Sequence, residues 1–478
     1  MSNTKSPSFL LKQKFPFEPT PSQNELFKKL DKFISNKDEW EALTFVLKGY
    51  AGTGKTTVIS TLINILRNFG YKYVLLAPTG RAAKVMANYS KKKALTIHKR
   101  IYKQKNNPHS GTLAFERMNN YSMSTIFIVD ESSMISDESE FGSNSLLTDL
   151  VEYVFTHPSN GHNGNKLIFV GDTAQLPPVG SNESPALQPE YLAQAFHFEV
   201  DSHEMVDVMR QGLESGILFN ATSLRKLIQN EQINLSFLTK GFKDFYRMTS
   251  EKLEDGLNYA YNKYGKENVI ILTRSNKNAV MYNRYIRQTI LFNEDEISTG
   301  DLLMIVRNNY FWLDEESPAG FLANGDFFEI VRTLREEEMH GLRFLNIEIR
   351  LIDYDDIPPF EVKIILDTLY SNTPALSLEQ NKALFESVGK DYEYIPNKRQ
   401  RMEAIKKDPY LNALQVKFAY CLTTHKAQGG QWPCVFVDQG YLKDEQIDKE
   451  FIRWLYTAIT RSSHELFLVN FNDKFFLN

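Results

Sequence analysis

The segment FVLKGYAGTGKTT, residues 45–57, constrains the fold of this chain more than any other stretch. An apolar, strand-like run leads into a glycine-rich loop, and the apolar spacing of VISTLINILRNFG then predicts a helix. Gly49, Gly54, Lys55 and Thr56 satisfy the pattern G-x-x-x-x-G-K-[ST], in which backbone N–H groups close around phosphate oxygens. A chance glycine-rich turn would lack the strand before and the helix after, so a nucleoside triphosphate site is the better interpretation.

Strands alternating with helices continue through most of the chain, which predicts parallel sheets of α/β type. Between about 295 and 370 the pattern changes to short strands and turns, typical of a small β module. Within it, FLANGDFFEIV (321–331) predicts a hairpin with its turn at Asn324-Gly325. Further strand-like runs lie at 73–79, 125–132, 166–172 and 269–275.

Composition limits the classes of protein to which the chain can belong. Its 478 residues suggest two to four domains, and its net charge of -4 requires any nucleic-acid site to rest on locally clustered cations. Two cysteines, Cys421 and Cys434, exclude a disulfide scaffold and the usual zinc clusters. Residues 1–19 suggest an extended, proline-containing arm, without the apolar core of a signal peptide. With no apolar run of membrane-spanning length, we expect a cytoplasmic protein and no membrane contact.

A pair of acids follows the strand-like run TIFIVDES. We expect Asp130 to help hold Mg²⁺ together with Thr56, and Glu131 to polarise an attacking water. An isolated Asp-Glu pair is usually a solvated strand end, but its place downstream of a phosphate loop favours the catalytic interpretation. Such a pair favours hydrolysis over transfer to a bound acceptor, because it offers a base to water.

Three polar residues further along suggest that ATP hydrolysis is coupled to motion. Gln175 lies just after a strand, where its side chain could sense the γ-phosphate, and Arg210 and Arg461 lie in the second half of the chain. Arginines from a facing domain stabilise charge on a transferring phosphoryl group, although a lone arginine is more often part of a surface ion pair. A cleft completed by both halves would couple hydrolysis to relative domain motion.

Eight motifs in order now indicate a family: GYAGTGKTT, APTGRAAK, LTIHK, VDESSM, GDTAQLPPVG, MRQ, LTTHKAQG and WLYTAITRS. Together they resemble superfamily 1 helicases, and most closely the RecD and Dda branch of the 5′-to-3′ group, superfamily 1B. The resemblance runs from about residue 20 to 470. It implies ATP-driven translocation along single-stranded DNA and duplex unwinding by a monomer in a bacterial or phage-like setting. It also suggests roles in DNA repair, recombination or replication, with a single-strand-binding protein or repair proteins as partners.

The resemblance also implies roles for individual residues. Gln23 would contact adenine, Gln175 would couple nucleotide state to DNA, and Gln428 and Gly429 would lie near the γ-phosphate at the domain interface. The loop residues expected to bind ATP are Gly49, Ala51, Gly52, Thr53, Gly54, Lys55, Thr56 and Thr57. The residues in motifs that line the DNA channel are Pro78, Thr79, Arg81, His98, Lys99, Tyr102, Thr424 and His425.

A basic segment supports the DNA interpretation on physical grounds. Residues 91–105 contain seven Lys or Arg and no acid, as a binder of phosphate backbones requires, although a solvated lysine-rich surface is the alternative. The family inserts a strand-splitting pin at about 99–124. Its candidate wedge residues are Tyr102, Phe115 and Tyr121.

The expected architecture is two RecA-like parallel-sheet domains, with a β-hairpin inserted in the first and an SH3-like module in the second. The limits are an arm at 1–19, a first domain at 20–198, a second at 199–294 and 416–478, and the module at 295–415. Residues 375–410 have no clear counterpart in the family.

Two other functions stay open. The chain could be a nucleic-acid-stimulated translocase that displaces proteins or acts on RNA, or a nucleotide-dependent switch or scaffold. Product formation on tailed duplexes separates the first from a helicase, and DNA-insensitive hydrolysis would indicate the second. Because the sequence shows no nuclease motif or docking domain, we expect a stand-alone protein.

Overall fold

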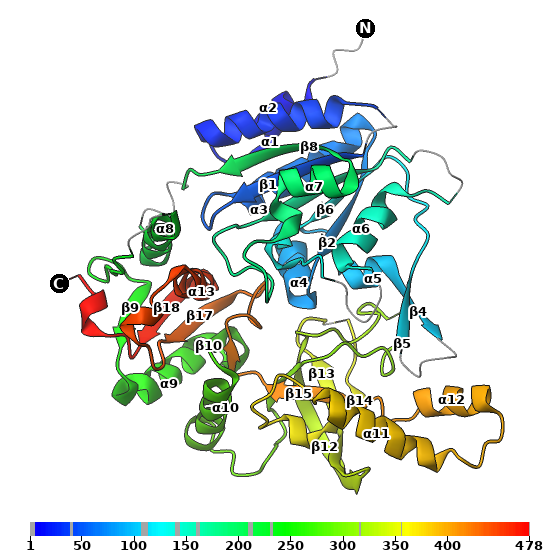
Figure 1. Ribbon diagram of the computed structural model, residues 1–478. Helices are drawn as coiled ribbons and strands as arrows, with labels where there is room; N and C mark the ends of the chain where they lie inside the picture. Colours follow the sequence, from blue (N-terminus) through cyan, green and yellow to red (C-terminus); the bar gives the residue numbers. More distant parts are fainter. Residues whose placement is uncertain are drawn as a thin grey trace.

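The computed structural model consists of two α/β domains and a small β barrel (Figure 1). It describes residues 5–38, 42–106, 113–138, 144–158, 163–208, 214–229, 233–314, 317–354 and 356–477. The predicted fold class, two parallel-sheet domains with a hairpin insertion in the first and a β-rich insertion in the second, is confirmed. No helix in these described ranges is both long and apolar enough to cross a membrane.

The first domain is built on a six-stranded parallel sheet of order β3-β2-β6-β7-β1-β8. Side chains alternate between its faces: Phe45 and Leu47 pack with α2 and α3 on one side, and Val46 packs with α6 and α7 on the other. The strands are β1 Leu43–Gly49, β2 Lys72–Ala77, β3 Ala94–Thr96, β6 Thr125–Val129, β7 Lys166–Gly171 and β8 Glu199–Met205. The helices are α1 Pro7–Lys14, α2 Pro21–Ser35, α3 Lys55–Leu66, α4 Gly80–Ser90, α5 Ile97–Ile101, α6 Leu146–Phe155 and α7 Pro189–Phe196.

The prediction of an extended N-terminal arm is wrong for residues 7–14, which form the helix α1. Ser6 accepts a hydrogen bond from the backbone N–H of Phe9, Pro7 fills the first helical position, and Leu11 is fully buried. Proline suits this position because its missing N–H would have no partner there. The prolines of this arm therefore include a helix-start signal, Pro7, and are not signs of extended chain alone.

A hairpin projects from the first domain, where the pin insertion was predicted. Its strands are β4 Tyr102–Asn106 and β5 Leu113–Arg117, paired antiparallel from Tyr102 opposite Arg117 to Asn106 opposite Leu113. Figure 1 shows it pointing away from the sheet, beside the barrel and its helices.

The second domain has a five-stranded parallel sheet of order β16-β10-β17-β18-β9. Its central strands are continuous apolar runs, as expected for a sheet covered on both faces. The strands are β9 Phe245–Met248, β10 Val269–Thr273, β16 Cys421–Thr423, β17 Trp432–Asp438 and β18 Ser462–Val469. The helices are α8 Gly216–Gln229, α9 Leu253–Tyr264, α10 Asn276–Tyr285 with a π-helical turn at Ile286–Ile290, and α13 Lys449–Ile459.

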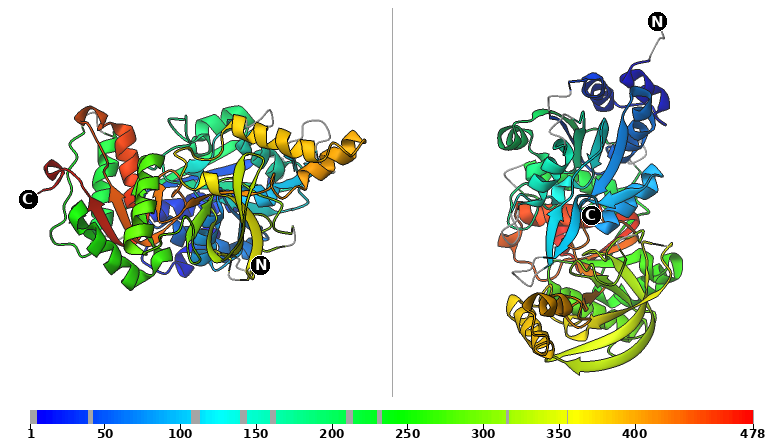
Figure 2. Two further views of the ribbon diagram at one scale, coloured as in Figure 1. Left: turned by 90° about the horizontal axis from the view of Figure 1, so that it is seen from below. Right: turned by 90° about the vertical axis from the view of Figure 1, so that its right-hand side faces the viewer.

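The β-rich insertion closes into a five-stranded barrel. Its strands are β11 Leu302–Ile305, β12 Phe327–Met339, β13 Leu342–Leu351, β14 Phe360–Ile365 and β15 Leu414–Phe418. Two helices, α11 Leu378–Asp391 and α12 Lys398–Lys406, account for most of the segment without a family counterpart. They pack on the barrel through Leu384, Val388 and Ile405 and extend from it as an arm (Figure 2).

Three sequence predictions about these boundaries are wrong. Residues 199–205 were assigned to the second domain, but as β8 they pair with β1 and complete the first sheet. The barrel was ended at 415, whereas β15 continues to Phe418. Asn324-Gly325 do form a turn, but the preceding strand that pairs with β12 is β11, about 20 residues earlier, because the described residues between β11 and β12 form no further strand.

Candidate functional site

The phosphate loop has the backbone that its glycines predict. β1 ends at Gly49 and α3 begins at Lys55, while Gly52 and Gly54 have φ angles of +77° and +88°. These left-handed conformations strain residues with a Cβ, so glycine is required there. The hydroxyl of Thr53 donates to the carbonyl of Tyr50 at 2.8 Å, which fixes the curl of the loop.

Two side chains hold the inside and the base of this loop. Lys55 Nζ donates to the carbonyl oxygens of Gly49 at 2.5 Å and Tyr50 at 3.0 Å, so the ammonium group lies at the mouth of the loop. Gln23 on α2 is buried, and its amide Nε2 donates to the carbonyl of Thr53 at 3.0 Å. The structure therefore brings Gln23 to the loop, and its contact with adenine stays a prediction.

Asp130 and Glu131 follow β6 directly, at the same sheet edge as the loop. Tyr89 on α4 donates its hydroxyl to Asp130 Oδ2 at 2.7 Å, and the backbone N–H of Glu131 donates to Oδ1 at 2.8 Å. Burial, and then the charge of Asp130, raise the pKa of Tyr89 well above its ordinary value, so this hydroxyl stays protonated. Tyr89 thus orients the carboxylate, a role that sequence reasoning missed because no local pattern links the two residues.

Glu131 is held in a strained conformation beside an arginine of the other domain. Its φ of +52° lies in the left-handed region, which costs a residue with a Cβ about 1–2 kcal/mol. Burial raises the pKa of its carboxyl group, and Arg461, whose Nη1 lies 3.9 Å from Glu131 Oε1, opposes that shift. Arg461 is itself buried and donates through Nε to the carbonyl of Thr457 at 3.1 Å.

The motif WLYTAITRS, which includes Arg461, also connects the two domains through hydrogen bonds of Tyr456 and Thr457. The Tyr456 hydroxyl on α13 accepts from the backbone N–H of Ala51 at 2.9 Å and donates to Asp172 Oδ2 at 2.7 Å. Thr457 Oγ1 accepts from the backbone N–H of Leu176 at 2.8 Å, and Gln428 Nε2 donates to the Leu176 carbonyl at 2.7 Å. One helix of the second domain therefore contacts both the phosphate loop and the segment after β7. The motif WLYTAITRS thus contributes Tyr456 and Thr457 as well as the arginine predicted from sequence.

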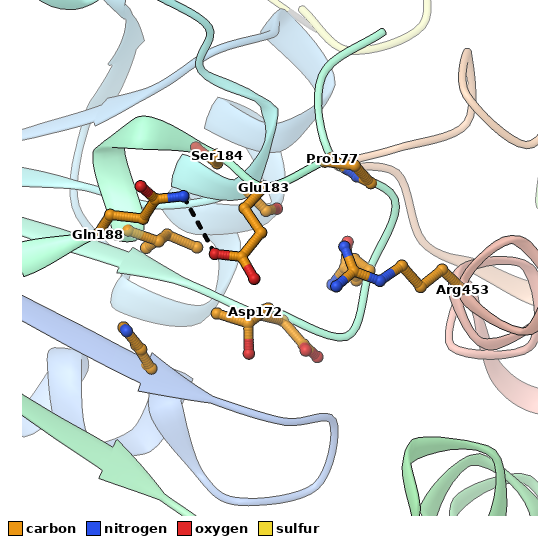
Figure 3. A pocket seen from close by; sticks show the side chains of 11 residues that line it. Asp172, Pro177, Glu183, Ser184, Gln188 and Arg453 are labelled. Atoms are coloured by element: carbon orange, nitrogen blue, oxygen red, sulfur yellow. Dashed lines mark hydrogen bonds between the residues drawn. The ribbon is translucent and has the colours of Figure 1, made fainter. Parts of the chain in front are cut away.

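The segment after β7 also lines a small polar pocket, together with Arg453 of α13 (Figure 3). Gln175 lines it and is buried, and its Oε1 has no hydrogen-bond partner among the described residues. Arg453 reaches this pocket from α13 and donates to the carbonyl of Asn182 at 2.9 Å, while Gln188 donates to Glu183 at 3.0 Å. An unsatisfied amide at a domain boundary is suited to accept a new partner when the domains move.

The remaining nucleotide-site predictions have separate outcomes. Gly429 has a φ of +74°, and a Cβ there would lie 2.8 Å from the Cβ of Ala82, so it packs against α4 rather than the phosphate loop. Gln428 lies at the domain interface through its bond to Leu176. Arg210 lies outside the described residues.

Several residues predicted to bind DNA are engaged within the protein. Thr79 caps α4 by accepting from the backbone N–H of Ala82 at 3.2 Å, and Pro78 precedes it, half-buried. The Arg81 guanidinium lies over the rings of Phe327 at 4.4 Å and Trp432 at 4.1 Å. It therefore joins the first domain to the barrel and to the second domain.

Near the hairpin, the candidates His98 and Tyr102 are packed within the protein, whereas Tyr121 is exposed. Burial lowers the pKa of His98 to about 4, and its ring lies 5.5 Å from that of Tyr102. Tyr102 donates to Asp149 Oδ2 at 2.7 Å, which fastens the base of the hairpin and argues against a wedge role. The Phe115 side chain lies outside the described part, whereas Tyr121 is 72% exposed.

In the second domain the two DNA candidates lie in the loop after β16. Thr424 is fully buried, and its Oγ1 has no hydrogen-bond partner among the described residues. Burial lowers the pKa of the neighbouring His425. In the first domain, Lys91, Lys92 and Lys93 are exposed, so part of the predicted basic segment faces solvent.

Comparisons with known proteins agree with this arrangement. A family model described as an AAA domain matches residues 35–181, and one described as a UvrD-like helicase C-terminal domain matches residues 418–469. An uncharacterized protein of Acanthamoeba polyphaga mimivirus is 26% identical and covers 88% of this chain and 94% of its own length. The ATP-dependent RecD2 DNA helicase of Deinococcus radiodurans is 31% identical over 181 residues, which are 37% of this chain and 21% of that protein.

Solved structures of Pif1 helicases are similar at greater distance. One, described as unwinding forked double-stranded DNA, is 15% identical with a TM-score of 0.48, covering 96% of this chain and 94% of its own. Another, from Bacteroides in complex with ADP-AlF3 and ssDNA, is 14% identical with a TM-score of 0.45, covering 97% and 95%. The two family models and the RecD2-like stretch agree with the resemblance to superfamily 1B helicases that the eight ordered motifs carry.

Proposed function

We propose that the protein is an ATP-dependent DNA helicase that moves 5′-to-3′ on single-stranded DNA and unwinds duplex ahead of it. The observation that carries the proposal is the position of Arg461 from the second domain, 3.9 Å from Glu131 of the first. An ATPase whose charge-stabilising arginine comes from a facing domain is completed only when the domains meet, so hydrolysis and domain motion are linked. Both the 5′-to-3′ polarity of translocation and the DNA substrate rest on the family resemblance.

The phosphate loop would bind ATP as follows. Lys55 would leave its two loop carbonyls for the β- and γ-phosphates, and the N–H groups at the start of α3 would hold the phosphate oxygens. Thr56 and Asp130 offer the hydroxyl and carboxylate oxygens that Mg²⁺ prefers, so the residues fit that ion. Bound Mg²⁺ neutralises charge on the phosphates. Tyr89 holds Asp130 in a single orientation for this task.

Glu131 would polarise the water that attacks the γ-phosphate. Its pairing with Arg461 keeps both side chains in the cleft, and arrival of a γ-phosphate would draw the guanidinium toward the phosphate oxygens and release the carboxylate. Loss of the phosphate would restore the pair. Each cycle would therefore change the interaction between the two domains.

The segment after β7 would carry this change toward DNA. Leu176 is bonded to Thr457 and Gln428 of the second domain, and the buried amide oxygen of Gln175 beside it has no hydrogen-bond partner in the described part of the chain. A shift of α13 therefore moves the backbone next to Gln175. We assign the coupling of nucleotide state to DNA binding to this short segment.

A comparison of 5′-tailed and 3′-tailed duplexes tests the proposed activity directly. We expect ATP-dependent strand separation on the 5′-tailed duplex and ATP turnover that single-stranded DNA accelerates. DNA-stimulated turnover without strand separation would instead support a translocase that displaces proteins or acts on RNA. Slow turnover that DNA does not change would support a switch or scaffold. A role in repair, recombination or replication, and action as a monomer, belong to the same proposal.

Arg461→Ala tests the observation on which the proposal depends. An arginine that stabilises the transferring phosphoryl group contributes about 10³-fold or more to turnover. We therefore expect turnover to fall by roughly that factor while ATP affinity changes much less, measured by steady-state hydrolysis and nucleotide titration. Lys449→Ala, an exposed lysine on the same α13, is the matched control. A loss confined to ATP affinity would rule out this role for Arg461.

A further inference from the structure

The barrel rests on the first domain at the start of α4, within the motif expected to line the DNA channel. Asp326, just before β12, packs its Oδ1 against Gly80, where a Cβ would collide with that oxygen. Asp353, just after β13, pairs with Lys84 on α4, with 3.1 Å between Oδ1 and Nζ. Two barrel acids therefore occupy the first turn of this helix and its flank.

The start of α4 is a place where an anion is favoured. The helix has 11 residues, and the N-terminal end of a helix carries unpaired N–H groups and partial positive charge. Lys84 adds a cation on its flank, and the exposed Lys91, Lys92 and Lys93 lie at the other end of the same helix. A nucleic-acid phosphate has the charge and the acceptor oxygens for this place.

Each of the two acids has one carboxylate oxygen without a hydrogen-bond partner among the described residues. Asp326 is 1% exposed, yet its Oδ1 has no hydrogen-bond partner in the described part of the chain, and neither has Oδ2 of Asp353. A buried oxygen left without a partner costs about 1–3 kcal/mol. Burial raises the pKa of Asp326 to about 8, which agrees with a carboxyl group that gains little from its surroundings. Such a contact is easy to displace.

Neighbouring cations are also held by the barrel. Lys99 Nζ donates to the carbonyl oxygens of Ser317, at 3.2 Å, and of Pro318 in a barrel loop. Arg81 lies over Phe327 at the start of β12. Three cations along this face, Lys84, Lys99 and Arg81, are thus already engaged by barrel groups.

We propose that this contact is a latch: the barrel acids Asp326 and Asp353 occupy the place on α4 that a nucleic-acid phosphate would take, and a bound strand must displace them. The latch rests on the proposed function, since it regulates the DNA side of the same site. It predicts that the DNA-free protein is held closed by its barrel and that single-stranded DNA binds to the opened form.

The test compares variants by their affinity for a fluorescent oligothymidylate. The double variant Asp326→Ala, Asp353→Ala removes both acids from α4 and should bind the oligonucleotide about tenfold more tightly. The control Glu348→Ala, Glu361→Ala removes two charges from neighbouring positions of β13 and β14 on the same barrel and should match the original protein. Asp326→Asn keeps the shape of the protonated side chain and should not increase affinity at pH 7.

A second measurement reports on the latch without DNA. Hydrogen exchange of the backbone amides of residues 80–86 should become about tenfold faster in the double alanine variant and stay unchanged in the control. Unchanged exchange, or wild-type binding with no gain in the double variant, would overturn the latch alone. If no protein in the set binds the oligonucleotide, the proposed DNA function fails and the latch fails with it.

Discussion

The barrel contacts both α/β domains, but its two contacts differ in how their buried polar groups are satisfied. At the second domain, Arg287 and Asp301 are almost fully buried and 2.8 Å apart. Asp301 also accepts from the backbone N–H of Ser298 at 2.7 Å and from the Tyr420 hydroxyl at 3.0 Å. At the first domain, one carboxylate oxygen of each barrel acid has no hydrogen-bond partner among the described residues.

This difference indicates that one contact is a permanent joint and the other is separable. A buried ion pair with every oxygen bonded fixes one geometry, because any displacement leaves charges unpaired in a low dielectric. A half-satisfied contact loses little when it opens, since water can then bond the free oxygens. The barrel should therefore move with the second domain and against the first.

Asp301→Ala should cost the most stability of any change at these contacts. Removing one partner of a buried pair leaves the Arg287 charge uncompensated, which typically costs about 3–5 kcal/mol. We expect a loss of this size in the free energy of unfolding, measured by urea denaturation with a probe of the second domain. Glu348→Ala is the control, because its partner Arg332 is largely exposed and such pairs contribute at most about 1 kcal/mol. Equal losses in the two variants would remove the basis for calling this joint permanent.

The parts of this molecule that sequence could predict are those made by residues close together in the chain. The phosphate loop from Gly49 to Thr57 depends on glycine conformations and a following helix, all local, so its residues could be named in advance. Alternating apolar strands and helices likewise predicted both parallel sheets. The helix α1 was also local, but its cap was overlooked in favour of the prolines.

Sequence could not predict hydrogen bonds between residues far apart in the chain when the side chains belong to no recognisable sequence motif. Tyr89 bonds Asp130 across 41 positions, and Tyr456 bonds Ala51 across 405. A tyrosine hydroxyl has no spacing rule that reveals such a partner. The barrel acids at α4 belong to the same class, because Asp326 looked like part of a turn until the fold placed it against Gly80.

The separable contact should also depend on pH through Asp326. Its pKa in the closed form is about 8, against an ordinary value of 3.8, so the closed form keeps a proton that the opened form releases. The proton on Asp326 therefore stabilises the closed form; this stabilisation is fully present below about pH 4 and is lost as the pH rises to about 8. One released proton changes the opening equilibrium at most tenfold per pH unit, which is up to about 2.7 kcal/mol between pH 5 and 7.

Among the described residues, Asp353, Lys99 and Tyr354 interact electrostatically with Asp326. Lys84 and Arg81 interact with the neighbouring Asp353. Burial lowers the pKa of Lys99 to about 8, so it stays mostly protonated up to neutral pH and does not mask the effect below it. Protection factors for the amides of residues 80–86, corrected for intrinsic exchange, should fall from pH 5 to 7. The same profile in Asp326→Asn should be flat. A matching fall in that variant would assign the pH dependence to another group.

Lys84→Met should have the smallest effect, and it separates local opening from global stability. The Lys84–Asp353 pair is partly exposed, with the lysine side chain 32% accessible, so its loss should change the free energy of unfolding by less than about 1 kcal/mol. Exchange at the start of α4 should nevertheless become up to about fivefold faster, because the pair spans the opening contact. Lys29→Met is a close control: Lys29 is similarly exposed, pairs with Asp201 and donates to the carbonyl of Ser202, but lies entirely within the first domain. If both variants change exchange at α4 equally, the Lys84 pair is an ordinary surface bridge. If only Lys84→Met does, this ion pair controls the local opening at α4 although it contributes little to the global free energy of unfolding.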